Sequence, residues 1–342
     1  MESLTTLLAA AAAAVAAPAL PPPAVPPRAP LDVALVQLVI APPTPPPVPL
    51  SSEAMLALGT AQERMTVPVS IDQRGPWNFV IDTGAERTVV SRELAGVLGL
   101  ASGPQVRVIA MTGPAEVGSV IVPRLSVSQI SRETIEAPAL GAVDMGAAGM
   151  LGLDALQGHT ISIDFTRGQM TVKPARRRSS PTYVALPGEV VVQAKSLVGQ
   201  LIVTDAFWHG KRISVIVDTG SPVTVGNGAL LAAITRRPKL IGPMDMRSAT
   251  GVTLHTTAFA VDRLDIGGIG FNDVRVAFSD VPPFRRFGLA DTPALLLGMD
   301  ALRLFRTVAI DFANREIRFA LPHGADAPAT DGLAGAGGRP GG

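Results

Sequence analysis

The sequence contains no cysteine, which excludes disulfide bonds, thiolate catalysis and cysteine-ligated zinc or iron–sulfur sites. Histidine is also scarce, and the histidines lie far apart in no metal-ligand spacing, so we expect each to be structural or exposed. They are His159, His209, His255 and His323. The sequence therefore indicates neither a metal site nor a cofactor.

Charge of one sign is not in excess either. The formal net charge is +1, whereas a protein that binds phosphates gathers basic residues on one face, so no nucleic-acid partner is expected. The one basic run, Arg176 to Arg178, is followed by Ser-Ser-Pro and predicts a solvated linker.

Long hydrophobic runs are missing beyond the N-terminal region, where no stretch approaches the roughly 18 apolar residues that a membrane-spanning helix requires. Residues 1–19 are rich in Leu and Ala and end in small residues, which predicts a secretory signal peptide. Because this stretch has Glu2 and no Lys or Arg, an uncleaved anchor or a disordered leader stays open, and we expect membrane contact only through such an anchor. Together with the richness in Arg, Ala and Gly, the leader favours export to a bacterial periplasm or secretion.

Proline is concentrated in residues 20–53, a segment that cannot pack as a helix or central strand and is predicted to be an extended linker or a prosegment. Within it, Val33 to Ile40 is an apolar island. This island predicts an edge strand or, alternatively, a prosegment strand that covers a cleft. Residues 323–342 are mostly Gly, Ala and Pro and are expected to be disordered.

One short pattern occurs twice, since residues 79–85 are FVIDTGA and residues 215–221 are VIVDTGS. In each copy an apolar run ends on a carboxylate, which predicts a buried strand that delivers Asp82 or Asp218 into a tight turn. The two acids are 218 − 82 = 136 residues apart. Two carboxylates in matching positions suggest one shared acid–base centre.

Further landmarks recur in the same order around both motifs, so the chain contains an internal duplication. In the first and second copy they are a strand pair before the acid (65–81 and 201–217), a helix with Ser91 or Asn227 as N-cap (91–98 and 227–234), a Thr-Gly hairpin tip (112–113 and 250–251), a Leu-Gly-x-Asp motif (151–154 and 297–300) and a final hairpin (161–172 and 308–319). The glycine of each Leu-Gly-x-Asp motif is expected to let another backbone approach closely. Two copies predict two lobes, 54–173 and 188–322, joined by a linker at 174–187.

These motifs resemble those of the retropepsin-like aspartic proteases, with two protease-type units joined in one polypeptide over roughly residues 60–320. The resemblance implies an all-β, bilobal architecture of two duplicated β-barrel-like lobes with one short helix each. It also implies that Asp82 and Asp218 form a catalytic dyad at the interface of the lobes.

The resemblance assigns supporting roles to the residues that follow each acid. Thr83 and Thr219 would brace the two lobes through hydroxyl-to-backbone hydrogen bonds, and Gly84 and Gly220 would allow the close approach that keeps the carboxylates coplanar. The fourth position differs, because Ala85 in the first motif corresponds to Ser221 in the second.

The hydroxyl of Ser221 predicts a hydrogen bond to Asp218 that would lower the pKa of this carboxyl, so Asp218 is expected to be the more readily ionised member. The chemistry of the pair follows from its charge. Two carboxylates a few ångströms apart cannot both ionise easily, so the dyad holds one shared proton. One carboxyl can then take a proton from water while the other gives one to the scissile group.

Both copies have a hairpin tip after the acid, at 113 − 82 = 31 and 251 − 218 = 33 residues beyond it. The resemblance therefore implies two flaps, with Met111, Thr112 and Gly113 at one tip and Thr250, Gly251 and Val252 at the other. The flaps would close over an extended peptide that is bound through strand-like backbone hydrogen bonds. Met111 and Val252 are candidate pocket walls or core residues.

The other matched acids, Asp154, Asp300, Asp164 and Asp311, follow glycines or lie in hairpins and are expected to fill turn and cap roles. The sequence as a whole predicts an aspartic endopeptidase that acts on protein or peptide in an extended conformation, as a monomer with an internal pseudo-dimer. Two alternatives stay open: a catalytically silent peptide-binding module with the same fold, and an enzyme whose lobes pair between chains.

Overall fold

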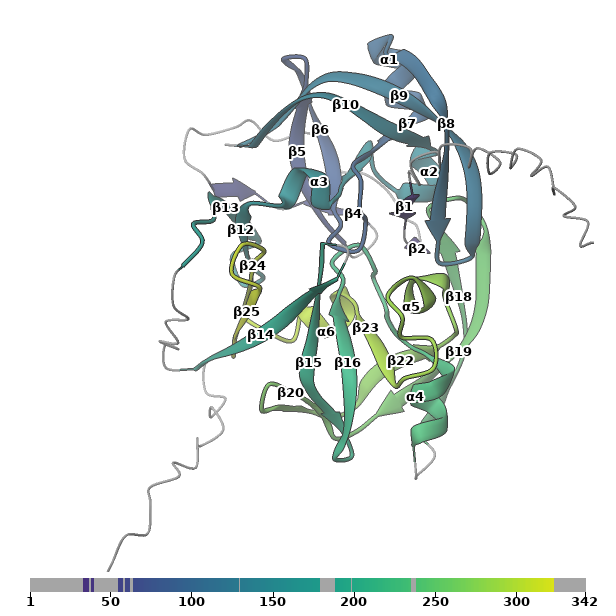
Figure 1. The fold of residues 1–342 in the computed structure, drawn as a ribbon, viewed down its shortest axis with the longest axis vertical. Coiled ribbons are helices and arrows are strands. Elements are labelled where there is room, and N and C mark those ends of the chain that lie inside the picture. The colour runs from purple at the N-terminus through teal and green to yellow at the C-terminus, as the bar shows by residue number, and fades with distance from the viewer. Residues whose placement is uncertain are drawn as a thin grey trace, which may run out of the picture. The chain divides into compact units, whose positions relative to one another are not determined.

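The computed structural model describes residues 64–128, 130–178, 188–197, 199–234 and 238–322, together with the backbone of short strands that precede them (Figure 1). These strands are β1 (Val33–Val36), β2 (Leu38–Val39), β3 (Met55–Ala57) and β4 (Gly59–Ala61). The predicted leader at 1–19, the tail at 323–342, most of segment 20–53 and the linker from 179 to 187 lie outside the described residues.

The first lobe is built on a sheet whose strands follow the order β1-β8-β9-β10-β7-β11-β6-β5-β4. Its remaining strands are β5 (Arg64–Ile71), β6 (Arg74–Ile81), β7 (Val89–Ser91), β8 (Ala101–Ala110), β9 (Gly113–Val127), β10 (Ile130–Leu140) and β11 (Gly149–Leu151). Its helices are α1 (Arg92–Leu98), α2 (Ala142–Met145) and α3 (Leu153–Leu156).

The second lobe repeats this order along the chain. Its strands are β15 (Gln200–Trp208), β16 (Lys211–Val217), β17 (Thr224–Gly226), β18 (Lys239–Ser248), β19 (Thr253–Val261), β20 (Leu264–Ile266), β21 (Ile269–Phe271), β22 (Val274–Phe278) and β23 (Ala294–Leu297). Its helices are α4 (Gly228–Ala233), α5 (Pro282–Arg286) and α6 (Met299–Leu302). The prediction of an all-β, two-lobed fold is confirmed.

The predicted helix after each Asp-Thr-Gly motif is present and begins at the predicted cap. The Ser91 hydroxyl accepts the Leu94 N–H at 3.0 Å, and the Asn227 Oδ1 accepts the Leu230 N–H at 2.8 Å. Each lobe has more than the one predicted helix. The additional helices have four or five residues each and are α2, α3, α5 and α6. Such helices are too short to produce a periodic sequence pattern.

A short strand is inserted next to the strand that carries each acid. In the first lobe, β11 lies parallel to β6 and antiparallel to β7, and in the second, β23 has the same relation to β16 and β17. The glycine after each inserted strand permits close contact, as predicted. A Cβ on Gly152 would lie 2.4 Å from the backbone of Arg87, and a Cβ on Gly298 would lie 2.5 Å from the backbone of Val223.

The two lobes share a sheet that their final hairpins form together. Its strands are β14 (Glu189–Leu197), β25 (Glu316–Ala320), β24 (Thr307–Asp311), β12 (His159–Asp164), β13 (Gln169–Pro174) and β3, in this order. The lobes meet where β12 pairs antiparallel with β24, with Ile161 opposite Ile310. The sequence predicts each hairpin but not their pairing, and this pairing joins the two cores into one buried cluster.

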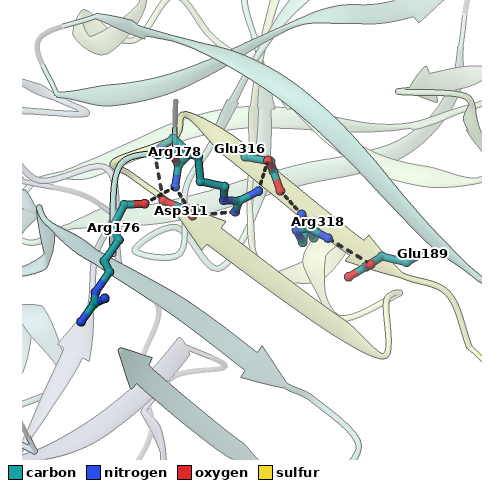
Figure 2. A network of polar contacts seen from close by, with 7 residues as sticks. Arg176, Arg178, Glu189, Asp311, Glu316 and Arg318 are labelled. Carbon is teal, nitrogen blue, oxygen red and sulfur yellow. Dashed lines mark hydrogen bonds and ion pairs between the residues drawn. The ribbon is translucent and has the colours of Figure 1, made fainter. Parts of the chain in front are cut away.

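The basic run before the linker is not simply solvated, which corrects the prediction for Arg178 (Figure 2). Its guanidinium lies 3.3 Å from Glu316 Oε2 and 3.2 Å from Asp311 Oδ2. Arg318 continues the network, because it contacts Glu316 and lies 3.4 Å from Glu189 Oε2. The Glu316 side chain is only 2% exposed, and a nearly buried carboxylate requires such paired cations.

In the described part of the chain, no helix is long and apolar enough to cross a bilayer.

We expect Arg178→Ala to lower the free energy of unfolding by about 1–2 kcal/mol, because it removes charged hydrogen bonds from Glu316 and Asp311. Urea unfolding followed by fluorescence or circular dichroism measures this change. Arg177→Ala is the matched control, since Arg177 is exposed, and its change should stay within about 0.5 kcal/mol. Equal destabilisation by both variants would contradict a role for the network.

Candidate active site

Asp82 and Asp218 are the first residues after β6 and β16, and both are completely buried. Each is anchored by its backbone to the inserted strand of its own lobe. The Asp82 N–H donates to the Leu151 carbonyl and the Asp218 N–H to the Leu297 carbonyl, both at 3.0 Å. The repeated sequence thus places the two acids in equivalent positions.

The turn after each acid directs two amide groups at its carboxylate. Oδ1 of Asp82 accepts the N–H groups of Gly84 at 2.8 Å and Ala85 at 2.9 Å. Oδ1 of Asp218 accepts those of Gly220 at 3.0 Å and Ser221 at 3.2 Å. Hydrogen bonds of this kind fix the orientation of a carboxylate and favour its ionised form.

Thr83 and Thr219 cross-link the two turns, as predicted. The Thr83 hydroxyl donates to the Val217 carbonyl at 2.9 Å, and the Thr219 hydroxyl donates to the Ile81 carbonyl at 2.8 Å. Each hydroxyl also accepts the backbone N–H of the opposite threonine at 3.1 Å. Four reciprocal hydrogen bonds therefore hold the two acid-bearing turns against each other.

Gly220 is required by the closeness of the two turns. A Cβ at this position would lie 2.2 Å from the Asp82 carboxylate, closer than any real side chain can approach. The prediction that Gly220 permits this approach is confirmed. Since Gly220 also donates its N–H to Asp218, one residue contacts both acids.

Burial raises the pKa of Asp82 to about 6, because the charged carboxylate loses its hydration there. The positive charge of Arg64 and the amides of Gly84 and Ala85 act in the opposite direction. The other carboxylate oxygen, Oδ2, is buried and accepts no hydrogen bond from the described residues. Asp82 is therefore a carboxyl group whose protonation changes in the mildly acidic range.

The predicted hydrogen bond from the Ser221 hydroxyl to Asp218 is wrong. This hydroxyl donates instead to the Val223 carbonyl at 2.6 Å. A hydroxyl has a single proton to donate, so it cannot also donate to the carboxylate. The difference between Ala85 and Ser221 therefore does not supply the expected asymmetry between the two acids.

The Thr-Gly tips do close two hairpins, one from β8 and β9 and one from β18 and β19, which we call flap 1 and flap 2. Gly113 and Gly251 have φ values of 128° and 88°, which explains the glycine in each tip. Flap 1 ends at Met111 and Thr112, and flap 2 ends at residues 249–252, which include Thr250.

Each flap tip reaches apolar residues of the opposite lobe. Met111 is 1% exposed and belongs to a buried cluster with Val223, Phe284 and Leu296 of the second lobe. Ala249, in flap 2, belongs to the corresponding cluster of the first lobe with other buried apolar side chains, including Val80, Leu140 and Met150. Both flaps are therefore closed, and the tip of each flap packs against the opposite lobe.

Val252 is 55% exposed, so the prediction that it is a core residue is wrong, and its role as a pocket wall stays a prediction. Ala249 takes the inward position at this tip instead. Flap 2 is further tied to the first lobe by Arg247, whose guanidinium donates to Asp144 Oδ1 at 2.9 and 2.6 Å. No corresponding bond is described at the tip of flap 1, where apolar burial of Met111 provides the contact.

The other matched acids fill structural roles, as predicted. Asp154 accepts the N–H and hydroxyl of Thr88 at 2.8 and 2.7 Å, and Asp300 accepts those of Thr224 at 3.2 and 2.6 Å. Burial raises the pKa of Asp300. The two threonines were not predicted from the sequence, although Thr88 lies six residues after Asp82 and Thr224 six residues after Asp218.

Asp164 and Asp311 close hairpin turns. Asp164 Oδ1 accepts the Arg167 N–H at 2.9 Å, and Asp311 Oδ1 accepts the Asn314 N–H at 3.0 Å. In the part of the chain that the structure describes, no group of three or more His, Asp or Glu side chains is arranged to hold a metal ion.

Two further buried polar residues lie near the dyad and were not predicted from the sequence. Arg64 is completely buried and donates to the Gly220 carbonyl at 3.4 Å and to the Met145 carbonyl. Gln200 is 1% exposed and donates to the Gly84 carbonyl. The available signal was their spacing, because 200 − 64 = 136, the same offset as between the two acids.

We expect Asp144→Asn to loosen flap 2, because it removes the charge that Arg247 contacts. A partly exposed ion pair contributes about 0.2–1 kcal/mol, so amide hydrogen exchange in residues 248–252 should become up to about five-fold faster. Asp245→Asn is the matched control, since Asp245 lies in the same hairpin and pairs with His255 on the exposed surface. An equal change in both variants, or none in either, would argue against the contact.

Two family models match this chain, one over each lobe. Residues 67–158 match the model described as gag-polyprotein putative aspartyl protease, and residues 204–301 match the model described as aspartyl protease. A search of curated proteins found no match. The matched regions contain the two Asp-Thr-Gly turns, the inserted strands and both flaps. The chain therefore belongs to the aspartyl proteases, as two retropepsin-like domains in tandem.

Proposed function

We propose that this protein is an endopeptidase in which Asp82 and Asp218 activate a water molecule to hydrolyse a peptide bond. The reciprocal hydrogen bonds of Thr83 and Thr219 carry this proposal, because they hold two buried carboxylates at one interface within a single chain. This arrangement also favours a monomer, since both halves of the site come from the same polypeptide.

The reaction needs two carboxyl groups in different protonation states. The ionised member accepts a proton from water as the oxygen attacks the carbonyl carbon, and the protonated member donates its proton to the carbonyl oxygen. When the tetrahedral intermediate breaks down, the carboxyl that took the proton from water donates it to the leaving nitrogen. The other carboxylate regains its proton from the hydroxyl that becomes the carbonyl of the product. The raised pKa of Asp82 supports this division, because burial keeps a shared proton on the dyad up to mildly acidic pH.

The flaps support an extended peptide as the substrate. The edge of β8 pairs with β1 in parallel, with Val33 opposite Arg107 and Val36 opposite Ala110. The edge of β18 pairs with β2 in antiparallel fashion, with Val39 opposite Arg247. Both flap edges therefore accept an added strand, and we propose that a substrate strand binds there through backbone hydrogen bonds.

We expect the purified protein to cleave an unstructured protein at acidic pH and to lose activity as the pH rises through about 6, where the shared proton is lost. Asp82→Asn and Asp218→Asn each remove one partner and should lower kcat at least about 100-fold. Mass spectrometry of the products measures cleavage. Equal cleavage by all three proteins would overturn the assignment, whereas peptide binding without cleavage would identify a catalytically silent binding module.

We propose that segment 20–53 is a prosegment, because β1 and β2 within it occupy both flap edges. A chain that begins after residue 54 should then cleave faster than the full chain, and a peptide of residues 31–41 should inhibit it. A chain that lacks the tail 323–342 is the control and should keep the activity of the full chain. Unchanged activity after removal of the prosegment would contradict the proposal.

A further inference from the structure

Arg64 and Gln200 are equivalent positions of the two repeats, yet one side chain is charged and the other is neutral. Arg64 is the first residue of β5 and Gln200 the first residue of β15. Both are buried, and each donates a hydrogen bond to the glycine carbonyl in the Asp-Thr-Gly motif of the opposite repeat. The repeats therefore make the same cross-lobe contact with different charge.

The contact places the guanidinium beside the dyad. Arg64 binds the carbonyl of Gly220, whose Cα is so close to Asp82 that an added Cβ would lie 2.2 Å from the carboxylate. The N–H of the same glycine binds Asp218. Arg64 is thus held by the residue that contacts both acids.

A completely buried guanidinium is unfavourable unless negative charge compensates it. Burial lowers the pKa of Arg64 to about 10, and the charges of Asp82 and Asp218 oppose this shift. Arg64 therefore remains positively charged throughout the acidic and neutral range. Reciprocally, its charge favours the ionised forms of both acids.

Two acidic groups near these elements are paired with other cations. Glu86, four residues beyond Asp82, contacts Arg286 at 2.9 Å. Asp144, which precedes the Arg64 contact Met145, is paired with Arg247. Arg64 is the cation whose charge acts on Asp82 and Asp218.

Arg303 is a further cation in this region, and it lies 3.8 Å from the sulfur of Met65, the residue after Arg64. Arg64 itself interacts electrostatically with both members of the dyad. Arg64 is thus the cation of β5 whose charge acts on the dyad.

We propose that Arg64 is a positioning residue of the dyad. Its guanidinium moves the pH range in which the dyad holds one proton to lower pH, while Gln200 makes the same backbone contact without a charge. This inference rests on the proposed endopeptidase function of the two acids. It assigns the asymmetry between the lobes to the first strand of each repeat, not to Ala85 and Ser221.

The direction in which Arg64 changes the apparent pKa values of the dyad follows from the charges. A dyad that has lost one proton carries one negative charge, and Arg64 balances it. Loss of the second proton leaves one uncompensated negative charge with Arg64 present, but two without it. Removal of the guanidinium therefore makes both proton losses harder and raises both apparent pKa values of the dyad.

The test compares Arg64→Gln, which makes the two repeats alike, with Arg64→Lys, which keeps the charge. We expect Arg64→Gln to move both limbs of the pH profile of kcat/KM upward by about 1–2 pH units, and Arg64→Lys to remain near the wild type. Gln200→Ala is the control, because it removes the equivalent hydrogen bond without a change of charge, and it should leave both limbs in place.

Carboxyl-carbon NMR titration of the dyad gives a second readout that needs no turnover, so the proposal can be tested even if no substrate is cleaved. Thermal unfolding checks that each variant is folded, and Arg64→Met replaces Arg64→Gln if the latter does not fold. Unchanged dyad titration in the charge-removing variant, or an equal shift with Arg64→Lys or Gln200→Ala, would overturn the proposal.

Discussion

The crossed hydrogen bonds between Thr83 and Thr219 are the constraint on which the rest of the structure depends. Two buried carboxylates repel each other and lose their hydration, so neither turn is stable beside the other without compensating contacts. The threonine hydroxyls supply these contacts from the residues directly after the acids. Their position fixes the distance between the lobes at the point where the two acids meet.

The shared sheet and the flaps support the same interface from outside. Pairing of β12 with β24 joins the lobes on one side. On another side they are joined by the two flap tips, each of which packs against the opposite lobe. The cores of the lobes are therefore not independent, because side chains of each repeat complete the buried surface of the other. A movement of one flap would expose apolar surface in the opposite lobe, which explains why the closed arrangement is stabilised.

The duplication is symmetric in its backbone and asymmetric in its charge. Equivalent threonines, glycines and structural acids make matching hydrogen bonds in both lobes. Arg64 and Gln200 also make equivalent hydrogen bonds, but only Arg64 is charged. Flap 2 is likewise held by a charged contact, and flap 1 by apolar burial. Two fused copies can diverge in this way because each position of the pseudo-symmetric site is encoded separately.

The sequence by itself determined the local features: the two acid-bearing turns, the N-caps Ser91 and Asn227, the glycine positions and the order of the repeated landmarks along each lobe. These depend on short-range periodicity and on backbone preferences, which a repeat displays twice. Only the tertiary structure decided which groups surround the acids. The offset of 136 residues marks Arg64 and Gln200 as equivalent positions, but it does not give their contacts. The contacts of Arg64, the partner of the Ser221 hydroxyl and the ion pairs of Arg178 depend on packing, side-chain direction and burial.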